Sequence, residues 1–123
     1  IASIETFASA YLRDHDRLHV LINNAGAVLG RRELTADGFE ATFGVNHLGH
    51  FLLTQLLLDR IIESAPARII NLSSSAHAVA RSGMTWDDLQ RERRYSEFQV
   101  YAESKLANIY FTRALASRLE GTN

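Results

Sequence analysis

The sequence contains no cysteine and only one proline, one lysine, one methionine and one tryptophan among its 123 residues. The absence of cysteine excludes a disulfide framework and a thiolate metal site, and it fits a reducing compartment such as the cytoplasm. Thirteen basic against fourteen acidic residues give a net charge of -1. Without a basic excess, neither nucleic acid nor an anionic membrane is expected as the main partner. The composition therefore predicts a globular, cytoplasmic protein.

Long hydrophobic runs are also missing. The longest apolar stretch without a charged residue, Phe43–Leu58, is shorter than the roughly 18–20 apolar residues that a membrane span needs, and it contains several polar side chains. We interpret it as part of a helix that runs, with an irregularity, from about Thr35 to Ser64. Its centre, Phe51–Leu58, is apolar on nearly all sides, which favours burial inside a domain or at a subunit interface.

Hydrophobic patterning predicts three main helices and two strands. The helices are expected at 4–15, 35–64 and 99–120, and the strands at 18–22 and 68–72. Ser3 is the expected N-cap of the first helix, Ser96 and Gln99 have the spacing of a capping box, and Gly121 is expected to stop the last helix. This alternation predicts an α/β layer with parallel strands. Because parallel strands need neighbours on both sides, the sequence indicates the central slice of a larger sheet.

The only lysine, Lys105, follows Tyr101 by four residues and so lies one turn away on the same helix face. A phenol is a poor base at neutral pH, but a neighbouring ammonium favours the phenolate, so such a pair suits general acid–base catalysis. An ordinary aromatic ring beside a solvated lysine is the alternative. Since arginine fills the twelve other basic positions, the single retained lysine favours the catalytic interpretation.

Further polar positions follow the strands or interrupt a helix. Ser74 lies just past the second strand, at the edge where open α/β sheets bind ligands, although a serine run there also suits a plain turn. Asn23-Asn24-Ala25-Gly26 follows the first strand and forms either a tight turn or a close backbone approach to a ligand. Gly44 and Asn46 are weak helix formers in an apolar helix, which indicates an irregularity there; a tolerated polar residue in a regular helix is the equally weighted alternative.

Other clusters favour structural roles. His47 and His50 are three residues apart without a third ligand, so no metal site is predicted and we expect buried or interface histidines. Arg91 and the two arginines that follow it alternate with glutamates, which predicts a solvated face. The sequence contains no strand, glycine-rich loop and helix that would hold a pyrophosphate.

Four landmarks in chain order resemble the short-chain dehydrogenase/reductase superfamily, and the match runs from about residue 18 to residue 119. They are Asn23-Asn24-Ala25-Gly26, Asn46, Ser74 and Tyr101-Ala102-Glu103-Ser104-Lys105. The segments Phe43–Phe51 and Ser104–Asn108 are similar to the retinol dehydrogenase-like branch. The resemblance implies a Rossmann-like, doubly wound parallel sheet, of which this chain holds a central slice with two strands and three main helices.

The resemblance also implies four catalytic residues. Tyr101 would exchange a proton with the substrate oxygen, and Lys105 would assist Tyr101. Ser74 would polarise the carbonyl or alcohol, and Asn46 would hold a water molecule that links Lys105 to solvent.

The implied cofactor is NADP or NAD, whose nicotinamide would exchange a hydride with a small alcohol or carbonyl substrate. Residues that would line the cofactor are Asn24, Ala25, Gly26, Tyr101 and Lys105. In this family the two long helices often pair across a dimer, so a homo-oligomer is expected.

The family's amino-terminal T-G-x-x-x-G-x-G unit and its C-terminal substrate region have no counterpart in the sequence. We therefore expect residues 1–123 to be a partial domain, inactive alone, of an NAD(P)-dependent oxidoreductase that interconverts an alcohol and a ketone or aldehyde. A non-catalytic binding or oligomerising module is the alternative. A light-dependent protochlorophyllide-reductase-like protein is a third interpretation, disfavoured because that branch carries cysteines near its site. Membrane attachment through a segment outside this sequence stays open.

Overall fold

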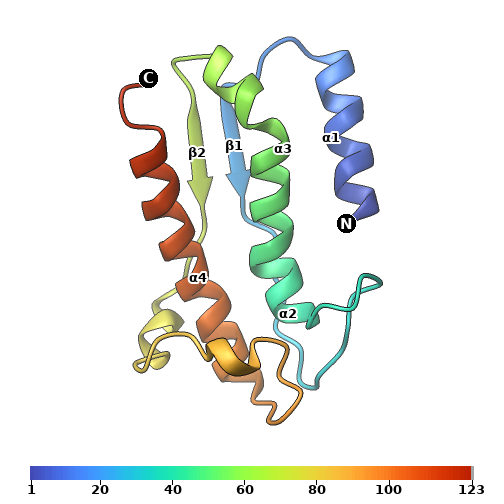
Figure 1. Ribbon diagram of the computed structural model, residues 1–123, viewed down its shortest axis with the longest axis vertical. Coiled ribbons are helices and arrows are strands. Elements are labelled where there is room, and N and C mark those ends of the chain that lie inside the picture. Colours follow the sequence, from blue (N-terminus) through green and yellow to red (C-terminus); the bar gives the residue numbers. More distant parts are fainter. Residues whose placement is uncertain (123) are drawn as a thin grey trace.

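The computed structural model describes residues 1–122, which form a two-stranded parallel sheet and the helices packed on it (Figure 1). In chain order the elements are α1 (Ala2–Asp14), β1 (Val20–Asn23), α2 (Ala41–Phe43), the π-helical segment η1 (Gly44–Leu48), α3 (Gly49–Glu63), β2 (Arg68–Asn71), the short 3-10 helices η2 (Ser75–Val79) and η3 (Trp86–Asp88), and α4 (Glu97–Arg118). The order and the parallel pairing confirm the predicted α/β class.

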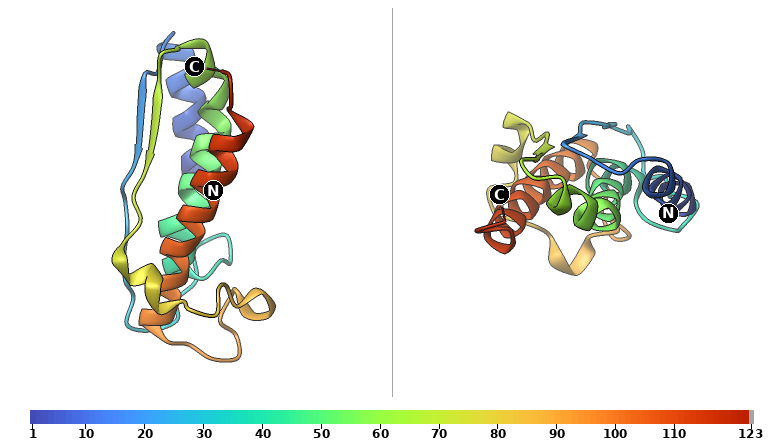
Figure 2. Two further views of the ribbon diagram at one scale, coloured as in Figure 1. Left: turned by 90° about the vertical axis from the view of Figure 1, so that its left-hand side faces the viewer. Right: turned by 90° about the horizontal axis from the view of Figure 1, so that it is seen from above.

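The sheet is covered on one face by α1, α3 and α4, as the left view of Figure 2 shows. Leu21 of β1 and Ile69 of β2 are register partners and pack against the helices. The alternate residues Val20, Ile22 and Ile70 stay exposed on the other face. Since parallel strands are normally buried on both faces, the fold agrees with the slice of a larger sheet that the sequence predicts.

The helices bury their apolar side chains in three clusters. The first lies between α1, α3 and the sheet, the second between α3 and α4, and the third where α2 and α4 meet the chain before η3. The residues at their centres are Ala8, Leu57 and Ile61; Leu58, Phe111 and Leu115; and Phe43, Met84 and Ala107.

The first two long helices begin elsewhere than predicted. Ser3 lies inside α1, whose N-cap is Ile1, so the expected serine cap is wrong. The second helix begins at Ala41 rather than near Thr35, because Gly38 closes a turn on the Thr35 carbonyl with a left-handed φ of 83°. The Glu40 carboxylate then caps α2 by accepting hydrogen bonds from the next two free backbone N–H groups, at 2.9 and 2.7 Å.

The predicted helix irregularity is confirmed at Gly44–Leu48, which is a π-helix. The Gly49 N–H donates to the Gly44 carbonyl, five residues back, and Asn46 lies in the middle of this segment. Farther along, Leu57 and Leu58 of α3 are buried, whereas Phe51 stays 44% exposed. The α3 surface at Phe51 is therefore left uncovered. Among residues 1–122, no helix is long and apolar enough to cross a membrane.

Helix α4 begins at Glu97, directly after the predicted cap residue Ser96, but the capping box is wrong. The Ser96 side chain makes no cap hydrogen bond, and the Gln99 amide instead donates to the Glu103 carboxylate at 2.8 Å. Gly121 has a left-handed φ of 82° and lies in the turn after the helix, two residues beyond the C-cap residue Leu119.

Candidate functional site

A pocket with a volume of about 320 Å³ opens at the carboxyl ends of the two strands, between the loops that follow them and α4. This is the edge at which open α/β sheets bind ligands. Four of the predicted site residues line the pocket together with four residues that were not predicted. The lining residues are Asn24, Gly26, Tyr101 and Lys105, and Ala27, Val28, Leu72 and Ser73.

Tyr101 and Lys105 lie on one face of α4, as their spacing predicts. The Lys105 ammonium nitrogen is 5.6 Å from the centre of the Tyr101 ring. Lys105 is only 5% exposed, and its ammonium donates a long hydrogen bond of 3.5 Å to the Leu72 carbonyl. An ammonium has three donors, so this buried cation keeps capacity for further acceptors in the pocket.

Asn46 is fully buried and joins the loop after β1 to α4. Its Oδ1 accepts from the Ala27 N–H at 2.7 Å, and its Nδ2 donates to the Ala27 carbonyl at 2.9 Å. The same Nδ2 donates to the Ser104 hydroxyl at 3.0 Å, which in turn donates to the Tyr101 carbonyl at 2.7 Å. Asn46 therefore fixes one wall of the pocket relative to the helix that carries Tyr101.

Gly26 leaves the space between two of these polar groups open. A Cβ atom at this position would lie 3.3 Å from Asn46 Oδ1 and 3.6 Å from Lys105 Nζ. Any side chain here would therefore occupy the part of the pocket next to the lysine. Ala25 lies on the other side of this loop and lines a second, mostly apolar pocket of about 530 Å³.

Ser74 is placed beside the pocket rather than in its lining. Its hydroxyl accepts from the Ala76 N–H at 3.2 Å and so caps η2, and its carbonyl accepts from His77 Nδ1–H at 2.6 Å. The preceding Ser73 lines the pocket and donates to the Lys105 carbonyl at 2.8 Å. The serine run thus forms a turn, as the plain alternative predicts, and the catalytic role of Ser74 stays a prediction.

Asn108 is a site residue to which sequence reasoning gave no role. It is buried, and its Nδ2 donates to the carbonyls of Asn46 and Leu72, each at 3.0 Å. Its Oδ1 accepts from the His47 ring at 3.0 Å. Its position three residues after Lys105 could have indicated this role, because both side chains then lie on the same helix face.

The two histidines have different surroundings. His50 is buried, as predicted, and burial together with the charge of Lys105 lowers its pKa. His47 packs between the rings of Phe43 and Phe111, with centroid distances of 5.2 and 6.1 Å. Burial lowers the pKa of His47, and its hydrogen bond to Asn108 counteracts this only in part. Both rings are therefore best described as neutral at pH 7.

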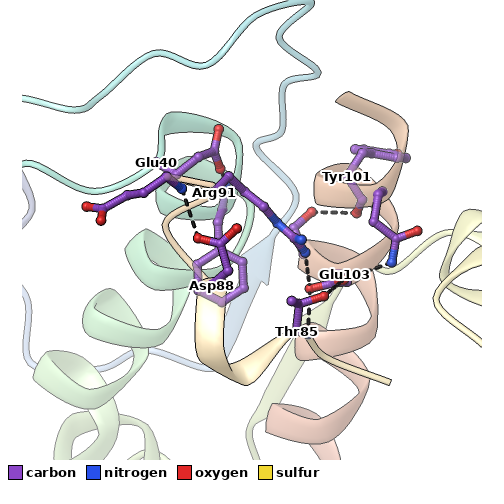
Figure 3. A network of polar contacts seen from close by, with 10 residues as sticks. Glu40, Thr85, Asp88, Arg91, Tyr101 and Glu103 are labelled. Atoms are coloured by element: carbon purple, nitrogen blue, oxygen red, sulfur yellow. Dashed lines mark hydrogen bonds and ion pairs between the residues drawn. The ribbon is translucent and has the colours of Figure 1, made fainter. Parts of the chain in front are cut away.

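The prediction that Arg91 lies on a solvated face is wrong. Arg91 is 8% exposed and forms an ion pair with Glu103, which is 2% exposed (Figure 3). Burial raises the pKa of Glu103, but hydrogen bonds from Gln99, Thr85 and Arg91 outweigh burial, so the pKa is lowered overall. The neighbouring Arg93 does stay 65% exposed. Alternating charges in the sequence gave no sign of Arg91's partner, because Glu103 belongs to another element.

Known proteins resemble this chain closely in sequence. The family model described as short chain dehydrogenase matches residues 1–86. Retinol dehydrogenase 12 of Mus musculus is 55% identical over 120 residues, and retinol dehydrogenase 11 of Homo sapiens is 53% identical over 120 residues. Each alignment covers 98% of this chain and 37% of the relative, so the chain spans little more than a third of these proteins' length.

Solved structures share the fold. An uncharacterized protein from Mycobacterium paratuberculosis is 43% identical with a TM-score of 0.79, over 96% of this chain and 41% of that one. RhlG of Pseudomonas aeruginosa, solved as an NADP active-site complex, is 28% identical with a TM-score of 0.71, over 98% of this chain and 44% of that one. The family model covers well over half of the chain, and the relatives extend the match through α4. The chain therefore belongs to the short-chain dehydrogenase family, and within it the chain is similar to retinol dehydrogenases.

Proposed function

We propose that the intact protein is an NAD(P)-dependent oxidoreductase that interconverts an alcohol and a ketone or aldehyde. The observation that carries this proposal is the buried Lys105 ammonium beside the Tyr101 ring, in a pocket at the carboxyl edge of the sheet. Family membership supports it, and so do the names of the relatives, which are retinol dehydrogenases. We leave the substrate at the level of a small alcohol or carbonyl compound.

The residues present fit an NADP or NAD cofactor. The open space at Gly26 lets the backbone approach a ribose, and the spare donors of Lys105 suit its hydroxyl groups. Asn24, Ala25 and Tyr101 complete the set that we expect to hold it. The Pseudomonas aeruginosa neighbour was solved with NADP, which supports this choice. When bound, the nicotinamide supplies or accepts the hydride.

In carbonyl reduction, the Tyr101 hydroxyl would donate a proton to the substrate oxygen, and in alcohol oxidation its phenolate would take that proton back. Lys105 would assist this step, because its buried ammonium lies 5.6 Å from the centre of the Tyr101 ring. Ser74 would hold the substrate oxygen, which requires its hydroxyl to leave the Ala76 N–H and turn toward the pocket.

Asn46 is expected to act in two ways. Its side chain holds Ala27 and Ser104, so it keeps the pocket wall at a fixed distance from α4. We also propose that it helps to hold a water molecule behind Lys105, as the family resemblance implies.

Two further expectations belong to the same proposal. We propose a homo-oligomer in which the exposed surfaces of α3 and α4 around Phe51 and Tyr110 meet a second copy. Met84 of the segment before α4 packs against Phe43 and Ala107, so it already covers the part of this surface next to them. We propose a cytoplasmic location from the absence of cysteine.

The test is turnover of the intact protein with NADPH or NADH and a series of alcohols, retinol included, and their aldehydes. Tyr101→Phe should reduce turnover by about 100-fold or more, because it removes the group that moves the proton. Lys105→Ala should do the same. Tyr110→Phe is the matched control on the same helix, since Tyr110 lies outside the pocket. Wild-type turnover in folded Tyr101→Phe would refute the mechanism.

A second measurement distinguishes the oxidoreductase from the alternative of a non-catalytic binding module. Residues 1–123 alone are titrated with NADPH and NADH, and the nicotinamide fluorescence is followed rather than that of Trp86, which lies in another pocket. We expect no saturable binding, since the phosphate-binding unit of the family has no counterpart in the sequence. Micromolar binding would show that this part of the chain forms a cofactor site by itself.

A further inference from the structure

Residues 84–95, here called the strap, cross the amino-terminal half of α4 and are tied to it by buried groups. Met84 and Leu89 of the strap pack in the cluster around Phe43 and Ala107. Arg91 forms the ion pair with Glu103 at the α4 surface (Figure 3). The strap is therefore anchored by apolar contacts and by one buried pair of opposite charges.

Glu103 gathers four donors on its two oxygen atoms. Oε1 accepts from the Thr85 hydroxyl at 2.9 Å and from the Gln99 amide at 2.8 Å. Oε2 accepts from the Thr85 N–H at 3.1 Å and pairs with Arg91. A buried carboxylate with this many donors is a strong anchor, and removing its cationic partner would leave an uncompensated buried charge.

The strap also holds the loop between β1 and α2, which carries the opposite wall of the pocket. The Tyr95 hydroxyl donates to the Leu29 carbonyl at 2.6 Å. Arg32 Nε donates to the Gln90 carbonyl at 2.8 Å, and the Gln90 side chain accepts from the Glu40 N–H at 2.7 Å. The strap thus connects α4 with the loop that contains Gly26.

The first turn of α4 begins without a side-chain cap. Ser96 provides no side-chain cap, so the orientation of this turn depends on what packs against it. Tyr101 follows one turn later. Arg91 itself has a φ of 54°, a left-handed conformation that is uncommon for a residue other than glycine and that its surroundings must maintain. The strap and the start of α4 therefore hold each other in place.

We propose that Glu103 and Arg91 are positioning residues for Tyr101. Their buried ion pair fixes the strap on α4 and thereby sets the distance between the Tyr101 hydroxyl and the loop at Gly26. Glu103 is two residues from Tyr101 and so faces away from the pocket, which means that it acts through the helix and not on the substrate. This inference rests on the proposed oxidoreductase function.

The first experiment compares Arg91→Met with Arg91→Lys and Arg93→Met in the intact protein. Arg91→Met should lower kcat about tenfold or more while KM for substrate changes little, because a misplaced proton donor affects the transition state more than binding. Arg91→Lys retains the charge and should recover most of kcat. Arg93→Met breaks an exposed pair with Asp87 in the same strap and should leave kcat unchanged.

The second experiment separates positioning from stability. In the double variant Arg91→Met, Glu103→Met the buried pair becomes an apolar pair, which is often neutral for stability. We expect it to melt near the wild-type temperature, to keep a lowered kcat, and to show faster hydrogen exchange at residues 98–104 than the wild type. A wild-type kcat in this variant would overturn the proposal. So would a loss of kcat that follows the loss of melting temperature across all the variants.

The proposed function and this inference fail in different ways. Wild-type turnover in Tyr101→Phe would contradict the oxidoreductase mechanism. An inactive Tyr101→Phe combined with a fully active double variant would contradict only the positioning role of Arg91 and Glu103.

Discussion

Replacing Asn108 with leucine tests whether this residue stabilises the site. The change keeps a buried side chain of similar length but removes partners from the Asn46 carbonyl, the Leu72 carbonyl and the His47 ring. A hydrogen bond contributes about 1 kcal/mol net. The Leu72 carbonyl retains the long hydrogen bond from Lys105, so the loss of its bond from Asn108 should cost the least stability of the three. We therefore expect the free energy of unfolding to fall by about 2–3 kcal/mol.

The measurement is urea unfolding of the intact protein followed by circular dichroism. The fluorescence of Trp86 would be a poor probe, because this residue is already 70% exposed in the folded state. The midpoint should fall at an unchanged m-value, since the surface exposed on unfolding stays the same. Arg118→Ala, which removes only an exposed hydrogen bond to Gln55, is the control. A loss below about 1 kcal/mol, or one no larger than the control's, would refute this account of Asn108.

Two further predictions concern the pocket and the buried ion pair. Gly26→Val should weaken NADPH binding at least about tenfold, because its side chain would fill the space beside Asn46 and Lys105. Gly30→Ala, whose added methyl group meets only the end of the Glu97 side chain, is the control. Equal affinity of the two variants in a fluorescence titration would contradict the assigned cofactor site. Glu103 has a lowered pKa in the folded protein, so its ionised form stabilises the fold above the ordinary glutamate value of about 4.5, and this contribution is lost as the pH falls below that value. The melting temperature of Glu103→Gln should therefore depend less on pH below about 4.5 than that of the wild type, and parallel curves would count against the role of this carboxylate.

The helices and strands could be predicted because each carries a strong local signal. The runs at 18–22 and 68–72 are short and mostly apolar; the first overlaps β1 at residues 20–22, and the second contains β2. The irregularity at Gly44–Leu48 could be predicted because glycine and asparagine interrupt an apolar helix. Helix starts were less accurate, because Glu40, a residue with no obvious capping pattern, turned out to cap α2.

Only those site residues could be predicted whose positions follow from the end of a strand or from spacing along one helix face. Tyr101 and Lys105 share the pocket because four residues make one helical turn. The ion pair of Arg91 and Glu103 could not be predicted, since it depends on how an irregular segment folds back on α4. For the same reason the sequence did not distinguish Ser73, which lines the pocket, from Ser74, which caps η2.

The π-helical segment inserts one extra residue into the helix that connects the pocket with the core. A π-helical turn holds about one residue more than an α-helical turn, so side chains before and after Gly44–Leu48 follow different phases. Asn46 can therefore face α4 while Leu57 and Ile61 face α1. Deleting the exposed Val45 would remove this extra residue, so the turn would close as an α-helical turn with Glu40 and Phe43 near their present partners, while Asn46 would move away from Ala27 and Ser104. The extra residue in this turn therefore serves the pocket rather than the core, and its deletion should impair cofactor binding before it impairs folding.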